Sequence, residues 1–336
     1  MDRTERVLLA GFEIKGWGAY RPETILASSA LDARHGHLPG WTEDAFGIRA
    51  RGVAGPHETT SFMAAAAVRA ALDRAGWPAD SLGAVIGGCG VMEQPIPGTA
   101  ALVQDRLGLG RSGVPAFDVN QTCLSFVLGL DVAALGLAAG RWRRVAVFAS
   151  DIASCGLDPA DAKVRSIFGD GAGAVVIEAS DGGAGLLGLA TETHGAHAGL
   201  AQLRAGGTRL RVEEGYEALV AGSRFEMDAF GIFKAAARCL PGVIERALDQ
   251  AGVARGDLAC VVCHQASAPG VEHVRRLFAP DTHVVDLFAT HGNQIAASIP
   301  TVLAHALDEG RAGPGDAVLL LGTAAGISAT AMVLRL

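Results

Sequence analysis

Short apolar runs of strand length alternate with longer Ala- and Leu-rich stretches along most of the chain, and this alternation occurs twice. The first series predicts strands and helices over 84–88, 97–107, 116–119, 123–139, 144–149 and 172–178. The second series predicts them over 230–252, 258–263, 269–277, 283–287, 294–309, 316–321 and 328–335. Because the strands are apolar throughout, we expect a mainly parallel sheet that helices cover on both faces.

The two series lie at a near-constant separation along the chain. Ile86 and Val262 are 176 positions apart, Cys123 and Asn293 are 170 apart, and Ser150 is 172 from Gly322. We therefore predict two similar βαβαβ halves, residues 1–180 and 181–336, joined near the Gly-rich stretch 179–185. Ligands of α/β sheets bind at the carboxyl ends of strands, so chemistry is expected just after each strand.

Composition excludes several classes of protein. Half of the 336 residues are hydrophobic and 19% are charged, which is unlike a disordered chain. A net charge of −7 provides no basic field for nucleic acid, so no nucleic-acid partner is expected. The apolar runs are too short for a membrane span. Six cysteines are too few for a disulfide framework, and no secretory signal is recognisable, which together predict a cytoplasmic location.

Cys123 follows the strand at 116–119 and stands at the start of an apolar helix. The partial positive charge and the free N–H groups of a helix N-terminus lower the pKa of a thiol, which favours a nucleophile. The alternative is a small buried packing residue, which is the usual role of a free cysteine.

His264 and Asn293 occupy comparable places in the second series. His264 ends the strand 258–263, and Asn293 opens the helix near 294–309, where capping is its ordinary role. A structural histidine is likewise the ordinary alternative. Cys, His and Asn at such positions could nonetheless supply a nucleophile and two donors to a carbonyl oxygen.

Three further motifs carry no cofactor. Cys260-x-x-Cys263-His264 matches a haem-attachment pattern, but strand geometry places Cys260 and Cys263 on opposite faces, which disfavours haem or a shared metal. The Gly-rich stretch 168–174 precedes a strand, whereas a phosphate loop must open a helix. The Gly-Thr-Ala-Ala-Gly segment, 322–326, is either a tight turn or a donor of backbone N–H groups to an oxyanion. We expect no cofactor and no metal.

The motifs taken together resemble the thiolase superfamily, and more closely the β-ketoacyl-acyl-carrier-protein synthase III group of condensing enzymes. The resemblance covers nearly the whole chain and rests on Trp41-(x5)-Gly-Ile-Arg, Pro-Ala-Phe-Asp-Val (115–119) before Cys123, Phe-Gly-Asp-Gly-Ala-Gly-Ala (168–174), His-Gln-Ala-Ser (264–267) and His-Gly-Asn (291–293). It implies a duplicated five-layer αβαβα fold and a homodimer.

The resemblance also implies roles for single residues. Cys123 would hold the acyl group of a thioester, supplied on coenzyme A or on acyl carrier protein. His264 and Asn293 would bind the thioester oxygen of a malonyl-type extender and stabilise the enolate formed as CO₂ leaves. The N–H groups of Cys123 and Gly326 would form the oxyanion hole.

Other positions bear on substrate binding. Trp41 would stack on the coenzyme A adenine, Phe168 would contact substrate, and Ile96 would stand at the gate of the acyl site near the dimer interface. Glu93 could enter the partner's acyl tunnel, or it could be a solvated loop residue.

Three basic residues usual in the family are replaced. Ala45 and Ala162 stand where coenzyme-binding arginines are expected, and Pro269 stands where an arginine would dock the carrier protein. Arginine is the side chain suited to phosphate and carboxylate recognition.

Four functions follow from these residues. The first is decarboxylative Claisen condensation in a specialised polyketide or secondary-metabolite pathway, rather than initiation of fatty-acid synthesis. The alternatives are an acyltransferase to an alcohol, amine or thiol, a non-decarboxylative joining of two acyl chains, and a non-catalytic partner of an active synthase. The presence of Cys123, His264 and Asn293 together disfavours the last.

Overall fold

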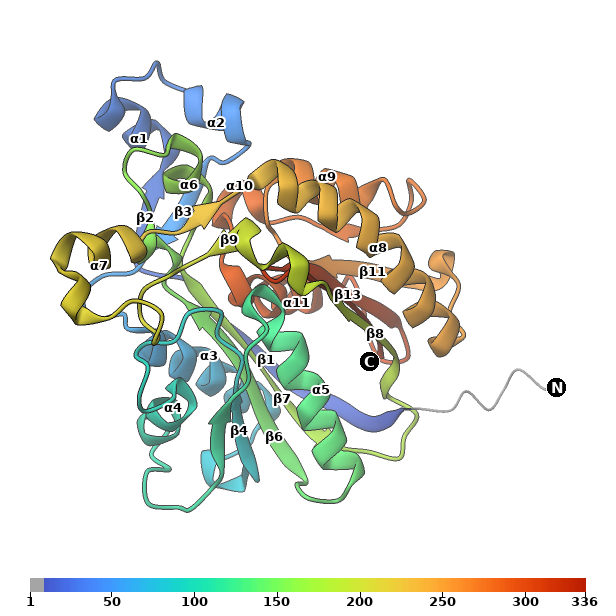
Figure 1. Cartoon of the computed structure of the whole chain (residues 1–336). Coiled ribbons are helices and arrows are strands. Elements are labelled where there is room, and N and C mark those ends of the chain that lie inside the picture. The colour runs from blue at the N-terminus through green and yellow to red at the C-terminus, as the bar shows by residue number, and fades with distance from the viewer. Residues whose placement is uncertain (1–8) are drawn as a thin grey trace.

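Ten strands form one sheet in the computed structural model, which describes residues 9–336 (Figure 1). From one edge to the other the order is β12 (Val284–Val285), β11 (Leu258–Cys263), β13 (Ala317–Ala324), β14 (Ser328–Arg335), β8 (Gly185–Thr193), β1 (Ala10–Tyr20), β7 (Gly171–Ala179), β6 (Arg144–Asp151), β4 (Ala84–Gly87) and β5 (Ala116–Asp118). Only two residue pairs join β1 to β8, so the sheet consists of two five-strand sets meeting at that seam.

The strands are parallel only towards the two outer edges. β12, β11 and β13 run parallel, as do β6, β4 and β5, but every pair from β13 through to β6 is antiparallel. The prediction of a mainly parallel sheet was therefore wrong for its centre. Strand apolarity did not reveal this, because β14, β8 and β7 are buried on both faces whatever their direction.

The two strand sets and three layers of helices stack as five layers. The outer layers consist of α3 (Thr60–Ala75) with α4 (Thr99–Arg106) on one side and α8 (Ala229–Ala251) with α9 (Ala268–Arg275) on the other. Between the sets lie α5 (Ser125–Ala138) and α11 (Ser298–Asp308). This is the αβαβα arrangement that the family resemblance implied.

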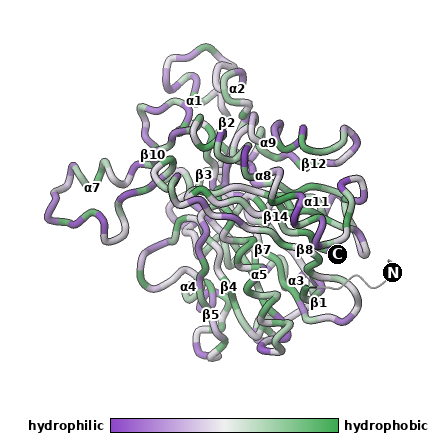
Figure 2. The backbone as a smooth tube through the Cα atoms, turned by 45° about the vertical axis from the view of Figure 1, so that its right-hand side comes forward, coloured by the Kyte–Doolittle hydropathy of each residue, from purple (hydrophilic) through white to green (hydrophobic). Residues whose placement is uncertain are grey.

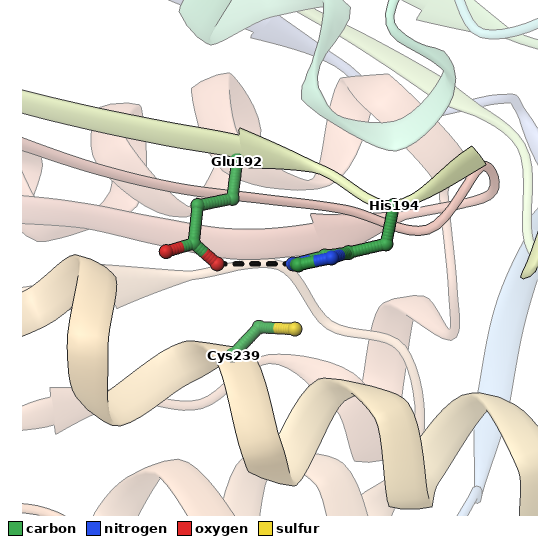
Figure 3. Close-up of side chains that lie close together, drawn as sticks. All are labelled: Glu192, His194 and Cys239. Carbon is green, nitrogen blue, oxygen red and sulfur yellow. Dashed lines mark hydrogen bonds and ion pairs between the residues drawn. The ribbon is translucent and has the colours of Figure 1, made fainter. Parts of the chain in front are cut away.

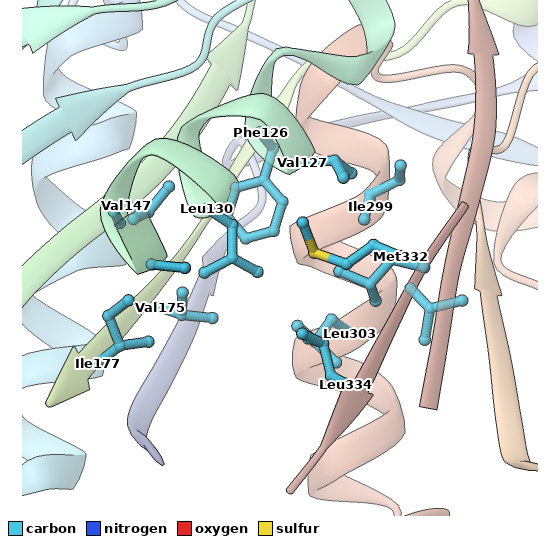
Figure 4. Packing of buried hydrophobic residues seen from close by; sticks show 14 of the residues in the cluster. Phe126, Val127, Leu130, Val147, Val175, Ile177, Ile299, Leu303, Met332 and Leu334 are labelled. Atoms are coloured by element: carbon cyan, nitrogen blue, oxygen red, sulfur yellow. The ribbon is translucent and has the colours of Figure 1, made fainter. Parts of the chain in front are cut away.

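The central layer is closed by apolar side chains from both halves (Figure 4). Phe126 and Leu130 of α5 face Ile299 and Leu303 of α11, with Met332 of β14 beside them. All five side chains are fully buried. This core fixes the N-terminal ends of α5 and α11 against each other, and those ends carry the candidate site residues.

Smaller elements gather beside the sheet and project from it (Figure 2). Two-stranded sheets pair β2 (Thr24–Ala27) with β3 (Ala50–Val53), and β9 (Ala201–Gln202) with β10 (Glu226–Met227). The short helices are α1 (Ser28–His35), α2 (Trp41–Phe46), α6 (Ala162–Ile167), α7 (Tyr216–Gly222) and α10 (Phe288–His291). The 3₁₀ turns are η1 (Ala79–Ser81), η2 (Thr122–Leu124), η3 (Ala153–Gly156), η4 (Gly195–Leu200), η5 (Val212–Glu214), η6 (Arg255–Asp257) and η7 (Ile295–Ala297).

β1 and β8 did not emerge from the sequence pattern because glycines interrupt their apolar runs. The glycines are required by packing. A Cβ on Gly16 would lie 2.0 Å from the carbonyl oxygen of Ala71 in α3, and one on Gly188 would lie 2.2 Å from that of Ala247 in α8. Because the helices approach these strands so closely, glycine is needed in them, and the apolar pattern that would have predicted the strands is lost.

Within residues 9–336, no helix has both the length and the apolar character that crossing a membrane requires. β7 ends at Ala179 and β8 begins at Gly185. The assignment of 1–180 and 181–336 as separate units stays a prediction.

Candidate active site

Two matching turns, one before α5 and one before α11, form the centre of the site. Thr122 and Ile295 both have φ of 50°, an uncommon left-handed conformation for residues other than glycine, and they are 173 positions apart (295 − 122). The same separation relates β6 to β13 and the start of α5 to that of α11. Cys123 therefore corresponds to Ala296 and not to Asn293, so the pairing drawn from the sequence was three residues out of register.

The same hydrogen bonds hold both turns. The Thr122 N–H donates to Oδ1 of Asn120 at 3.1 Å, and the Ile295 N–H donates to Oδ1 of Asn293 at 2.9 Å. One residue before each left-handed position, a backbone N–H donates to the serine that opens the following helix, Ser125 at 2.8 Å and Ser298 at 3.2 Å. Asn120 is thus the counterpart of Asn293, and the sequence analysis did not find it.

Cys123 lies in η2, and its thiol is not activated in the resting structure. Burial, followed by the negative charge of Asp151, raises the pKa of the Cys123 thiol to about 12. The N–H groups of Ala325 and of Cys123 itself oppose this shift without overcoming it. The expectation that the helix terminus lowers this pKa was wrong, because desolvation disfavours the thiolate more than nearby dipoles favour it.

His264 is buried behind the nucleophile turn. Burial lowers its pKa to about 4, so the imidazole is neutral at ordinary pH, and its Nδ1 has no hydrogen-bond partner among residues 9–336. A Cβ on Gly322 would lie 2.9 Å from Cβ of His264 and 3.0 Å from Cδ2 of Leu124. The absent side chain at Gly322 therefore lets His264 approach the turn that carries Cys123.

Asn293 is held from three directions. Its Nδ2 donates to the carbonyl of Ala266 at 3.3 Å, two residues beyond His264. Its backbone N–H donates to Ile167 at 2.7 Å, and its carbonyl accepts from Gly169 at 3.1 Å. A Cβ on Gly169 would meet the carbonyl oxygen of His291 at 2.1 Å. The Gly-rich stretch 168–174 therefore serves close packing around Asn293.

The structure brings together three of the residues that the sequence singled out, although they are far apart along the chain. η2 packs against η7, which begins two residues after Asn293, and the Asn293 side chain is bonded to Ala266, two residues after His264. The N–H of Ala325, one residue before Gly326, lies against the Cys123 thiol. The catalytic roles of Cys123, His264, Asn293 and Gly326 stay predictions.

Asp151 was missed by the sequence analysis although it fits the rule used there. It ends β6 at the carboxyl end of an apolar strand and is fully buried. Burial raises the pKa of Asp151 to about 7, against the opposing effect of N–H groups from Val91, Gly90, Ala297 and Ala296.

Trp41 opens α2 with one ring face already covered. His37 stacks on it with ring centroids 3.9 Å apart, and Nη2 of Arg165 lies 3.4 Å from Nε2 of His37. Ala162 opens α6 three residues before Arg165, and Ala45 lies in α2. A basic residue thus stands near Trp41 despite the alanines, and Pro269 lies in the first turn of α9.

Glu93 and Ile96 belong to the loop that follows β4. The carboxylate of Glu93 accepts the N–H of Ser61 at 2.6 Å, at the start of α3. This half-buried residue therefore caps a helix of its own chain, which differs from both roles expected for it. Ile96 is 85% exposed, whereas Phe168 is buried and packs edge-on against Phe225.

A cluster of three potential metal ligands lies on the outer face of β8 (Figure 3). The ligand atoms of Glu192, His194 and Cys239 fall within 4.8 Å of one another. Glu192 already pairs with His194 at 3.0 Å and with Arg246 at 2.6 Å. The guanidinium satisfies the carboxylate without an ion, so these contacts do not assign a metal.

Comparison with known families gives two matches. The family model described as 3-oxoacyl-[acyl-carrier-protein] synthase III matches residues 117–195, and the model of its C-terminal part matches 248–336. Among curated relatives, the chain is 37% identical over 324 residues to a β-ketoacyl-[acyl-carrier-protein] synthase III of Roseiflexus castenholzii, covering 96% of this chain and 97% of the relative. It is 36% identical over 323 residues to an acetoacetyl CoA synthase of a Streptomyces species, covering 95% and 97%.

Solved structures agree with these matches. The crystal structure of 3-oxoacyl-[acyl-carrier-protein] synthase III from Aquifex aeolicus superposes with a TM-score of 0.87 at 29% identity, over 97% of this chain and 100% of that one. A priming β-ketosynthase from a polyketide biosynthetic pathway also gives 0.87, at 27% identity over 99% and 98%.

Proposed function

Because the chain belongs to the 3-oxoacyl-[acyl-carrier-protein] synthase III family and is a condensing acyltransferase, we propose that it joins an acyl group on Cys123 to a malonyl-type thioester with loss of CO₂. The convergence of Cys123, His264 and Asn293 on two packed turns carries this proposal. The thioesters are substrates, and no resident cofactor is invoked.

In the first step the Cys123 thiol attacks the acyl thioester. A C–S bond forms, the old C–S bond breaks, and the thiol proton leaves with the departing thiolate. Because the resting thiol is neutral, its proton must move as the bond forms. The N–H groups at Cys123 and Ala325, with Gly326 beside them, would stabilise the oxyanion.

In the second step the extender loses its carboxylate as CO₂, and the electron pair passes to the thioester carbonyl as an enolate. His264 and Asn293 would donate hydrogen bonds to that oxygen. A neutral donor suits this task, since the site then stabilises charge only as it develops. The enolate carbon attacks the acyl carbonyl, and Cys123 leaves as thiolate.

The replacement of three basic residues favours a specialised pathway over fatty-acid initiation. The guanidinium groups that suit phosphate or an acidic carrier surface are missing at Ala45, Ala162 and Pro269. Relatives that include an acetoacetyl CoA synthase and a polyketide priming ketosynthase support this inference.

Intact-mass measurement tests the proposal directly. The protein is incubated with a panel of acyl-CoA and acyl-carrier-protein donors, with Cys123→Ala as the control, and malonyl thioester is then added while CO₂ is recorded. An adduct that Cys123→Ala lacks, followed by CO₂ release and a new carbon–carbon bond, is the expected result. Absence of any adduct would overturn the proposal, and acylation followed only by transfer to an alcohol, amine or thiol would favour the acyltransferase.

Asn293 and Asn120 provide a matched pair of variants because they make the same hydrogen bonds in the two turns. Asn293→Ala is expected to abolish decarboxylation and spare acylation. Asn120→Ala is expected to leave malonyl decarboxylation in place. Equal loss of both steps in Asn293→Ala would contradict the role assigned to Asn293.

We also expect a homodimer. β5 ends the sheet with a half-buried edge, and Val91, Met92 and Ile96 expose apolar surface on the nearby loop. Light scattering should give twice the mass of one chain, and a mass of one chain would refute this expectation.

A further inference from the structure

Asp151, at the end of β6, joins two segments of the site, the loop after β4 and η7, through backbone hydrogen bonds. Its Oδ1 accepts the N–H of Val91 at 2.7 Å, and its Oδ2 accepts those of Ala296 at 3.0 Å and Ala297 at 3.3 Å. Within residues 9–336 no cationic side chain forms an ion pair with this buried carboxylate. Burying a charged carboxylate costs free energy unless hydrogen bonds compensate the lost hydration. The N–H groups around Asp151 provide that compensation.

Gly90 marks the point where these two segments also meet the nucleophile turn. A Cβ there would lie 2.3 Å from Cγ2 of Ile295, 3.3 Å from Oδ1 of Asp151 and 3.4 Å from the carbonyl oxygen of Thr122. The loop after β4, the nucleophile turn and the turn after Asn293 therefore meet without space for a side chain.

The N–H groups at the start of η7 are divided between two acceptors. That of Ile295 goes to the Asn293 side chain, and those of Ala296 and Ala297 go to Asp151. If Asp151 loses its charge, two buried N–H groups lose an anionic acceptor, and the turn that orients the Asn293 amide is free to relax.

We propose that Asp151 is the positioning residue of the extender step, holding the Asn293 turn and the Gly90–Val91 loop in the arrangement that decarboxylation needs. The role rests on the proposed function. It acts through Asn293, because Asp151 is fully buried and has no exposed surface with which to contact a substrate. Acylation depends on the other turn and is not expected to need it.

Asp151→Asn tests this role, with Asp118→Asn as the matched control. Asp118 is a part-buried carboxylate that accepts the N–H of Ala100 at 3.1 Å, at the start of the outer helix α4. In Asp151→Asn, malonyl decarboxylation is expected to fall about 100-fold, the loss typical of a misplaced catalytic group. Acylation of Cys123 should be unchanged or faster, since the negative charge of Asp151 raises the pKa of that thiol.

Asp118→Asn should alter neither chemical step. Equal loss of acylation and decarboxylation in Asp151→Asn, or unchanged decarboxylation, would overturn the proposal. Gly90→Ala, which changes no charge but displaces Ile295, should reproduce the selective loss of decarboxylation.

Hydrogen exchange provides a readout independent of turnover. In Asp151→Asn the amides of residues 295–299 should exchange at least about tenfold faster, as the loss of one charged hydrogen bond implies, while those of 123–128 keep their protection. If the wild-type protein releases no CO₂, the proposed function fails, but exchange still decides whether Asp151 holds the turn. Unchanged exchange at 295–299 would overturn its role.

Discussion

The neutrality of His264 makes a quantitative prediction about stability in acid. Its pKa is lowered to about 4 in the fold by burial, against an ordinary value of 6.5. Between these values the unfolded chain binds a proton that the native state refuses, so stability falls as pH falls from 6.5 towards 4. Between about pH 7 and pH 5 the two pKa values imply a loss of about 2 kcal/mol from this group alone.

His264→Asn removes the group without adding a charge. Urea unfolding followed by tryptophan fluorescence, at both pH values and for both proteins, isolates the effect because every other titrating group cancels in the double difference. The variant should resist acid better by about 2 kcal/mol at unchanged m. His291, whose pKa burial also lowers to about 4, should show the same sign in His291→Asn. If the free energy of unfolding depended on pH equally in wild type and His264→Asn, the imidazole of His264 would not be buried and neutral. The proposal that it acts as an uncharged donor would then fail as well.

Three further changes test the surroundings of the site. Gly322→Ala places a Cβ 2.9 Å from His264 and should cost about 1–3 kcal/mol in urea unfolding while slowing decarboxylation, and a variant as stable and active as wild type would contradict this packing. Ala324→Asp puts a carboxylate at the position that corresponds to Asp151, where it should occupy the N–H groups around Cys123 and slow acylation at least about 100-fold by intact mass. Glu93→Gln should lower stability by about 0.5–1 kcal/mol through its contact with α3 and leave both chemical steps intact, so a selective loss of activity would return Glu93 to the substrate path.

Much of the architecture could be predicted from the sequence because its signals are local. Strands β4, β11 and β14 lie where apolar runs predicted them, and α8 begins and ends within one residue of its predicted range. Cys260 and Cys263 do belong to cores on opposite faces of β11. The failures involve contacts between distant segments. β1 needs glycine beside α3, and strand direction in the centre depends on partners that no single run specifies.

The site shows the same division between local and long-range information. The rule that polar residues follow strands led to Cys123, His264 and Asn293, and applied to β6 it would also have led to Asp151. The true register of the repeat depends on the left-handed conformation of Thr122 and Ile295, which neither residue type favours. The raised pKa of Cys123 depends on burial by chain segments far away in the sequence, so the helix-terminus argument alone gave the wrong sign.

Because the two turns correspond, the geometry observed in one half of the molecule can be used to infer the geometry in the other. In η7 the N–H groups of Ala296 and Ala297 surround a carboxylate oxygen at 3.0 and 3.3 Å. At the matching place on β13 the residue is Ala324, whose methyl group cannot fill the turn around Cys123. Superposing η7 and α11 on η2 and α5 would therefore locate an oxygen anion above Cys123. On the proposed mechanism, the superposed position of Asp151 Oδ2 gives a starting point for placing the oxygen of the tetrahedral intermediate beside the N–H group of Cys123.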